Sequence, residues 1–194
     1  VNTYEGYEQW QVTYPSRLMH SLGLRSLIVT NSSGSSNPDF EPGNFMLIRD
    51  HHNFIFRDPL YQWEVTNIES FSPYDKEYVA MAKDIAKKLD IKLYEGVLSA
   101  NLGPTYETPA EVRFQRSLGG DAASMSTFPE VIVAHSLGLK VLGLSVLTNY
   151  AAGLNKNPLT HEEVTETADS VSETFSKLIT ELIKNIDINN KGEN

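Results

Sequence analysis

The 194-residue sequence contains no cysteine, which excludes disulfide bonds and metal sites built from thiolates. Long apolar runs are also missing, and no stretch approaches the roughly 20 residues that a membrane-spanning helix requires. No run of five like charges occurs, so the chain carries no acidic or basic tail. These absences are typical of a protein from a reducing cytoplasm with no membrane partner.

Positive charge is scarce as well, since 16 Lys and Arg residues face 25 Asp and Glu residues and the formal net charge is −9. A nucleic-acid partner would favour clustered Lys and Arg, so this balance argues against one. With 40% apolar residues, the chain can bury a core as a single domain over residues 1–194. It starts at Val1 with neither an initiator Met nor a signal peptide, and we expect an N-terminal part to be missing.

Several sequence signatures of known chemistry are absent too. Neither the P-loop pattern GxxxxGK[ST] nor the dinucleotide fingerprint GxGxxG occurs. No GxSxG nucleophile elbow is present, so no Ser–His–Asp order can be argued. The five histidines show no HExxH or comparable ligand spacing, and we expect no metal site.

Short β-rich runs alternate with amphipathic stretches. Strands are predicted at residues 24–31, 45–51, 92–103, 122–126 and 139–149. Helices are predicted at residues 16–22, 73–89, 109–118 and 129–137, followed by a long helix after Pro158. This alternation indicates an α/β fold, a mixed and mostly parallel β-sheet flanked by helices on both faces. Residues 52–72 are rich in aromatics but aperiodic, and we expect a long loop there, near a site or an interface.

Helix starts are marked by Ser/Thr–x–x–Glu patterns. Capping boxes are predicted for Thr108 with Glu111, Thr127 with Glu130, and Thr160 with Glu163. Glu107 directly precedes the first box and takes no part in it. Ser126 precedes the second box and is left free to point at a ligand.

Four segments combine a strand end with unusual polar residues, and strand ends are where open α/β sheets bind ligands. The Ser/Gly loop at residues 30–37 offers backbone N–H groups and hydroxyls to an anion, although an ordinary polar turn has the same composition. Glu107 is either a site residue or a solvated acid near a helix start. Ser126 and Asn149 complete the set. The side-chain amide of Asn can both donate and accept hydrogen bonds at the edge of a heterocycle, although Asn is also common in turns. His161 opens the last helix, where a ligand could reach it.

Seven segments, in order along the chain, resemble the trimeric purine nucleoside phosphorylases. They are YEGY (4–7), VTNSSG (29–34), LIRDHHN (47–53), GPTYETPAE (103–111), MSTFPEVIVA (125–134), LTN (147–149) and HEEV (161–164). The resemblance implies the nucleoside-phosphorylase type of mixed-sheet fold and phosphorolysis of purine nucleosides in purine salvage. It also implies a cytoplasmic homotrimer. No metal or organic cofactor is implied, because inorganic phosphate is the second substrate.

The resemblance also assigns roles to individual residues. Asn149 would contact N7 of the purine, and Glu107 would accept hydrogen bonds from N1–H and from the 2-amino group of guanine. Tyr106 would pack on the base. The remaining assignments place Tyr4 and Met125 at the ribose, His161 at the 5′-hydroxyl, and Ser126 with the backbone of Ser32 at the phosphate.

Asn149 and His161 together favour 6-oxopurine nucleosides such as inosine and guanosine over methylthioadenosine, whose phosphorylases carry an aspartate in place of the asparagine. Two departures from the family pattern keep an alternative open. Asn2 stands where the family carries a phosphate-binding histidine, and the aromatic residue that crosses to a neighbouring subunit has only Phe54 or Phe56 as a substitute. A non-catalytic nucleoside-binding homologue with an impaired phosphate site is therefore the alternative.

Overall fold

The computed structural model describes residues 2–61, 63, 72–155 and 161–190. The strands in this part are β1 (Ser26–Ser35), β2 (Asn44–Asn53), β3 (Leu93–Ala100), β4 (Ala122–Ser124) and β5 (Lys140–Tyr150). The helices are η1 (Thr3–Glu5), α1 (Gln9–Val12), α2 (Tyr14–Ser21), α3 (Lys76–Lys88), α4 (Pro109–Ser117), α5 (Phe128–Ser136) and α6 (His161–Asn190). The predicted α/β class is confirmed, and the two short helical elements before α2 were not predicted.

The sheet closes into a barrel in the order β1-β4-β3-β2-β5. The prediction that ligands bind at strand ends assumed an open sheet instead. Three strand pairs are parallel (β1 with β5, β2 with β3, β3 with β4), and two are antiparallel (β1 with β4, β2 with β5). Closure depends on β5, which pairs along its whole length with β1 and over Gly143–Leu147 with β2. A bulge at Arg49 bends β2, because the register against β3 shifts between Ile48 and Asp50.

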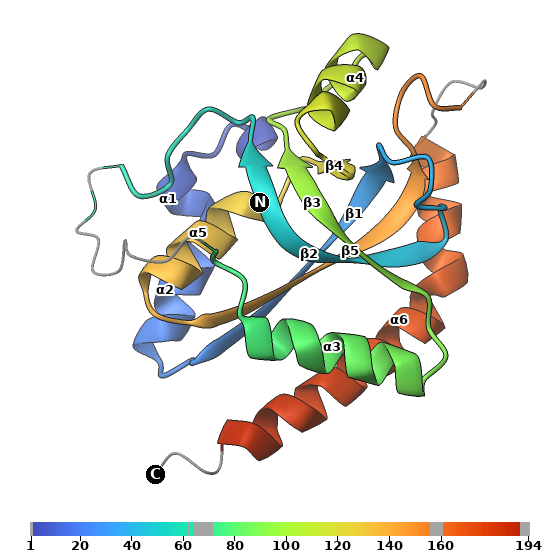
Figure 1. Ribbon diagram of the computed structural model, residues 1–194. Helices are drawn as coiled ribbons and strands as arrows, with labels where there is room; N and C mark the ends of the chain where they lie inside the picture. The colour runs from blue at the N-terminus through green and yellow to red at the C-terminus, as the bar shows by residue number, and fades with distance from the viewer. Residues whose placement is uncertain (1, 62, 64–71, 156–160, 191–194) are drawn as a thin grey trace.

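Helices cover the barrel from different sides (Figure 1). α3 and α6 pack on one face of β5, and α1, α2 and α5 gather on another side, while α4 lies above the ends of β1 and β3. β5 is apolar on both faces because it contributes to two cores. Val141 and Leu147 belong to a cluster shared with α5, and Leu142 and Leu144 belong to a cluster shared with α3 and α6. This double burial explains the unbroken apolar run in the sequence.

The helix starts agree only in part with the predicted capping boxes. Thr108 and Glu111 form the predicted box at α4. α3 begins at Lys76 rather than at residue 73, because the Asp75 carboxylate accepts from two backbone N–H groups of the first turn. The box predicted for Thr127 is wrong, since its side chain caps no backbone N–H. Thr160 lies outside the described residues.

The aromatic segment predicted as a loop starts later than expected, because β2 extends to Asn53. Its described residues 54–61 and 63 form neither helix nor strand, and residues 64–71 lie outside the described part. Within the described residues, no helix combines the length and apolar character needed to cross a membrane.

Candidate active site

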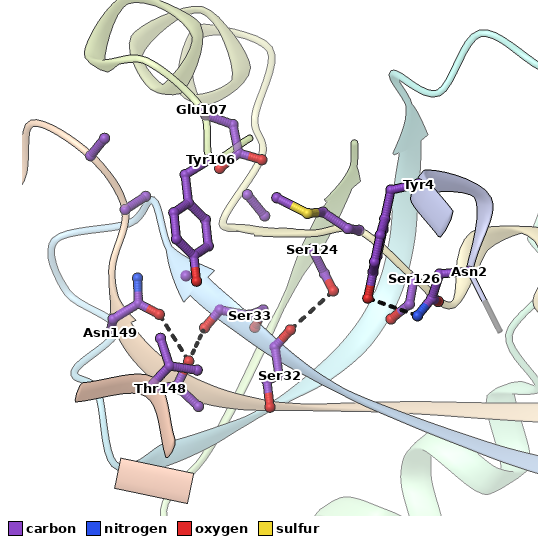
Figure 2. Close-up of a pocket in the computed structure, with 16 residues that line it drawn as sticks. Asn2, Tyr4, Ser32, Ser33, Tyr106, Glu107, Ser124, Ser126, Thr148 and Asn149 are labelled. Carbon is purple, nitrogen blue, oxygen red and sulfur yellow. Dashed lines mark hydrogen bonds between the residues drawn. The ribbon is translucent and has the colours of Figure 1, made fainter. Parts of the chain in front are cut away.

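A cavity of about 250 Å³ opens where the carboxyl ends of β1, β4 and β5 meet the loop that follows β3 (Figure 2). Residues from the chain start and from α6 complete its wall. The lining residues are Asn2, Tyr4, Ser32, Ser33, Gly34, Tyr106, Glu107, Ala123, Ser124, Met125, Ser126, Thr148, Asn149, Ala151, Ala152 and Val164.

Seven of the eight residues singled out from the sequence line this one cavity: Tyr4, Ser32, Tyr106, Glu107, Met125, Ser126 and Asn149. The eighth, His161, begins α6, and its side chain lies outside the described part of the chain. Val164, one turn further along α6, does line the cavity. Segments separated by more than a hundred residues are thus brought together at one end of the barrel.

Asn149 reaches the cavity because of a bulge in β5. Ser33 pairs with Leu147 and Gly34 pairs with Asn149, so Thr148 has no partner of its own in β1. Gly34 permits the close approach of the two strands, since a Cβ there would lie 3.0 Å from Asn149 Nδ2. Neither the bulge nor the role of Gly34 was predicted, because the sequence carries no local signal for a register shift.

The amide of Asn149 is oriented by two neighbours. Its Nδ2 donates to the carbonyl of Tyr150 at 2.9 Å, and its Oδ1 accepts from Thr148 Oγ1 at 2.8 Å. A primary amide has two donor hydrogens and two acceptor lone pairs. One of each therefore remains for a ligand, and the contact with the Tyr150 carbonyl fixes which end of the amide is the donor.

Glu107 and Glu111 lie four residues apart but have opposite environments. Glu111 accepts from the backbone and hydroxyl of Thr108, and these bonds lower the pKa of its carboxyl. Burial raises the pKa of the Glu107 carboxyl above its ordinary range, although hydrogen bonding to its own backbone N–H and, less strongly, to the Asn101 side chain partly offsets this. Glu107 is therefore a half-buried carboxylate at the cavity wall, whereas Glu111 is an exposed capping residue.

The two ends of the cavity differ in chemistry (Figure 2). Tyr106, Glu107 and Asn149 lie at one end, where an aromatic ring, a carboxylate and an amide surround the space. Tyr4 and Ser126 lie at the other end. The first end suits a flat heterocycle with several hydrogen-bonding atoms, and the second suits a hydroxylated or anionic group.

Hydroxyl groups and amides dominate the second end. Asn2 Nδ2 donates to Tyr4 Oη at 2.8 Å, and Ser124 Oγ donates to the Ser32 carbonyl at 3.0 Å. No Lys or Arg is among the lining residues that the structure describes. In this part of the chain, an anion would therefore be held by hydroxyls and backbone N–H groups rather than by cationic side chains.

Thr127, directly after Ser126, has a backbone φ of 85°, which is rare for a β-branched residue. Its hydroxyl accepts from Asn31 Nδ2 at 2.8 Å and lies 3.4 Å from Ser126 Oγ. This conformation replaces the predicted capping box, and it sets the direction in which Ser126 enters the cavity. Backbone strain of this kind is characteristic of ligand sites.

Ser33 and Gly34 belong to the predicted segment at residues 30–37, whereas the lining residues Ser124 and Thr148 were not predicted. Small hydroxyl residues within apolar strands give no sequence signal that separates a site from a packed interior. In the described part of the chain, no group of three or more His, Cys, Asp or Glu residues could hold a metal ion.

The chain is similar to known proteins in both sequence and structure. Residues 1–184 match the phosphorylase superfamily. The chain is 45% identical over 185 residues to purine nucleoside phosphorylase 1 of Bacillus subtilis, covering 93% of this chain and 68% of that protein. A Schistosoma mansoni purine nucleoside phosphorylase solved with inosine superimposes with a TM-score of 0.89 at 30% identity, covering 94% of this chain and 69% of the other. A Schistosoma enzyme solved with guanosine gives a TM-score of 0.88 at 30% identity, with 94% and 71% covered.

Proposed function

The chain belongs to the phosphorylase superfamily and, within it, to the purine nucleoside phosphorylases, and on this premise we propose that it acts on 6-oxopurine (deoxy)ribonucleosides such as inosine and guanosine. Phosphate attacks C1′ as the bond from C1′ to N9 breaks. The purine leaves with the bonding electron pair, and (deoxy)ribose 1-phosphate is the other product. Inorganic phosphate is a co-substrate, and the proposal needs neither a metal nor an organic cofactor.

The observation that carries this proposal is the Asn149 amide, the Glu107 carboxylate and the Tyr106 ring in the wall of one cavity. Cleavage builds negative charge on the purine, and a fixed donor at N7 stabilises this charge as it develops. The second Nδ2 hydrogen of Asn149 is suited to that role. Its remaining Oδ1 lone pair can accept from N7 if that atom is protonated as the base departs.

Glu107 supplies the selection for 6-oxopurines. An ionised carboxylate only accepts, and inosine and guanosine present N1–H as a donor, to which guanosine adds its 2-amino group. Adenosine has no hydrogen at N1, so its ring nitrogen would face the carboxylate unpaired. Burial of Glu107 strengthens this discrimination, because an unpaired acceptor away from water is costly. Tyr106 is 48% exposed and has surface available to pack on the base.

The other end of the cavity supplies the sugar and phosphate contacts. We assign Tyr4 and the backbone of Met125 to the ribose hydroxyls, and Ser126 with the backbone of Ser32 to phosphate. His161, at the start of α6, is assigned to the 5′-hydroxyl. These assignments agree with the hydroxyl-rich character of that end.

A cytoplasmic homotrimer is part of the same proposal and rests on the family resemblance. Phe56 is 82% exposed and Phe54 packs against it and against Phe114. Phe56 is therefore the better candidate for the aromatic residue that reaches a neighbouring subunit. Sedimentation as a single chain would contradict this part of the proposal.

Two alternatives make different predictions about turnover. A non-catalytic binding protein would retain Glu107 and Asn149 yet release no base, and Asn2 in place of a histidine favours it. A methylthioadenosine phosphorylase would prefer a 6-aminopurine with a blocked 5′ position. Asn149 argues against this alternative, since methylthioadenosine phosphorylases carry an aspartate at that position.

The test is hypoxanthine release from inosine, with and without phosphate, alongside the same assay on adenosine and methylthioadenosine. Release that requires phosphate and favours inosine supports the proposal. Release from methylthioadenosine alone would indicate the second alternative. Inosine binding in a calorimeter without release in either condition would indicate the binding protein.

A further inference from the structure

The turn that carries Ser126 into the cavity is tied to strand β1 by a side-chain hydrogen bond. Asn31, on β1, donates from Nδ2 to Thr127 Oγ1 at 2.8 Å. Thr127 directly follows Ser126 and is 4% exposed. Neither Asn31 nor Thr127 lines the cavity, whereas Ser126 does. The contact therefore joins two residues outside the cavity lining to the neighbour of one within it.

We propose that Thr127, held by Asn31, is a positioning residue that fixes the Ser126 hydroxyl as a donor to the phosphate co-substrate. The proposal rests on the function proposed above, in which Ser126 binds phosphate, and adds how that hydroxyl is oriented. Asn31 and Thr127 act through Ser126 and touch no substrate themselves.

The Thr127 hydroxyl makes this contact in place of a helix cap. Thr127 precedes the first residue of α5, where a Thr side chain ordinarily accepts from a backbone N–H of the first turn. Here it makes no such bond, and its backbone lies at a φ of 85°. This conformation is costly for a β-branched residue and persists only where the surroundings enforce it. The bond from Asn31 helps to hold Thr127 in it.

The direction of the hydrogen bonds follows from the chemistry of the groups. An amide NH2 only donates, so Asn31 occupies a lone pair of Thr127 Oγ1 and leaves the Thr127 hydrogen to point elsewhere. Ser126 Oγ lies 3.4 Å from Thr127 Oγ1, longer than an ordinary bond between hydroxyls. The Thr127 hydrogen on this side favours the Ser126 oxygen as the acceptor. The Ser126 hydrogen is then free to donate to a phosphate oxygen.

The other end of the Asn31 amide agrees with this direction. Asn31 Oδ1 is buried and has no hydrogen-bond partner among the described residues. An unpaired buried acceptor is costly, and the bond that Nδ2 donates to Thr127 offsets part of this cost. Donor orientation matters here because no Lys or Arg is among the described lining residues, so the hydrogens of hydroxyl and backbone groups must face the anion.

Substitutions that remove one hydrogen-bonding group at a time provide the test. Thr127→Val removes the hydroxyl and keeps the β-branched shape, whereas Thr127→Ser keeps the hydroxyl. Asn31→Ala removes the donor and leaves the residues of the turn unchanged. Ser126→Ala removes the hydroxyl that meets the anion. Thr174→Val, at an exposed position of α6 outside the cavity lining, is the matched control.

Inorganic phosphate is the probe, and calorimetry measures its Kd. We expect Thr127→Val to raise this Kd about tenfold and Asn31→Ala to raise it less. Thr127→Ser should retain most of the affinity, and Thr174→Val should equal the wild type. The KM for inosine at saturating phosphate should change little in Thr127→Val, because the base is assigned to the other end of the cavity (Figure 2). If thermal melting shows that Thr127→Val does not fold, Asn31→Ala takes its place.

A double variant gives a readout that a purely structural role would not move. If Thr127 acts through Ser126, Thr127→Val has no further effect once Ser126→Ala has removed the hydroxyl, and the two losses are not additive. A general loosening of the turn would instead weaken phosphate binding by the same factor in both backgrounds. Additive losses would therefore overturn the proposal. So would phosphate binding that is unaltered in Thr127→Val and Asn31→Ala, or in Ser126→Ala.

The binding measurement does not depend on turnover. If the wild type binds phosphate but releases no hypoxanthine from inosine, the proposed function fails, while the role of Thr127 is still decided by the Kd values. If release requires phosphate and Thr127→Val binds phosphate as the wild type does, the proposed function stands and the role of Thr127 fails. A wild type that does not bind phosphate would overturn both.

Discussion

At the scale of the residue, the site depends on polar groups whose environments differ from what their sequence neighbours imply. Glu107 and Glu111 look alike in the phrase GPTYETPAE, and only the capping box separates them. The box could be predicted from spacing, but the position of Glu107 outside it also suited a solvated acid, and only the family resemblance assigned it to a site. Its partial burial could not be predicted, since it depends on how β3 and α4 pack.

Replacement of Asn149 should slow the chemical step. Asn149→Ala removes the donor placed at the departing base, and we expect kcat for inosine to fall about 100-fold. Thermal melting should change little, because among the described residues the side chain hydrogen-bonds only to its neighbours Thr148 and Tyr150. Phosphate-dependent hypoxanthine release measures the effect, and an unchanged kcat would contradict the role at N7.

Glu107→Gln should both weaken guanosine binding and stabilise the fold. The amide presents a donor where only an acceptor suits N1–H, so we expect KM to rise about tenfold or more.

The sign of the stability effect follows from the raised pKa of Glu107. Below the unfolded pKa, both states hold the proton and the acid costs nothing. As pH rises toward the folded pKa, the unfolded chain releases the proton more readily and stability is lost. Glu107→Gln should therefore melt at a higher temperature than wild type at pH 8, and the gap should close near pH 4. A wild type that melts higher at pH 8 would contradict the burial of an ionised acid.

At the scale of the element, strand positions and helix positions were predicted and their irregularities were not. The five predicted strands and the helices from α2 onward appear within a few residues of the predicted bounds. Apolar periodicity is a local property, so the sequence contains it. The bulges in β2 and β5 and the backbone of Thr127 are set by pairing between distant segments. Those irregular places are also where the side chains of the site enter the cavity.

Gly34→Ala tests the bulge in β5. The new Cβ would lie 3.0 Å from Asn149 Nδ2, and the amide must move or rotate to relieve this contact. We expect kcat for inosine to fall about tenfold, since misplacement of a catalytic donor by less than 1 Å is enough for that loss. Circular dichroism should show an intact fold, because the backbone φ of Gly34 is not in the left-handed region. Full activity would indicate that the amide tolerates displacement.

At the scale of the whole molecule, the site and the stability of the fold are separable. The cavity lies at one end of the barrel, whereas the cluster between α3, α6 and β5 lies on a face that does not line it. Closure of the sheet was not predicted, because it requires every strand to have two partners, and these pairings join segments that are distant in the sequence. A linear pattern of apolar runs is the same for an open sheet and for a barrel.

Leu182→Ala should lower stability without changing the chemistry. Leu182 is 0% exposed and packs between α3 and β5, so truncation should lower the free energy of unfolding by about 2–5 kcal/mol. Urea denaturation measures this loss, and kcat at low temperature should match wild type. Ile183→Ala, at the exposed neighbour, is the control and should cost less than about 0.5 kcal/mol. Equal losses for the two variants would show that α6 is not packed as described.

Because the bulge gives Thr148 no partner in β1, the site depends on the number of residues in β5 as well as on the chemistry of its side chains. The loss of residue 148 would let the ladder pair without interruption, with Asn149 still opposite Gly34, but it would straighten the strand and remove the Thr148 hydroxyl that orients the Asn149 amide. A single-codon deletion at position 148 is therefore a route by which this sequence could lose its leaving-group contact while every functional residue type is retained. An inventory of conserved site residues would not detect that loss.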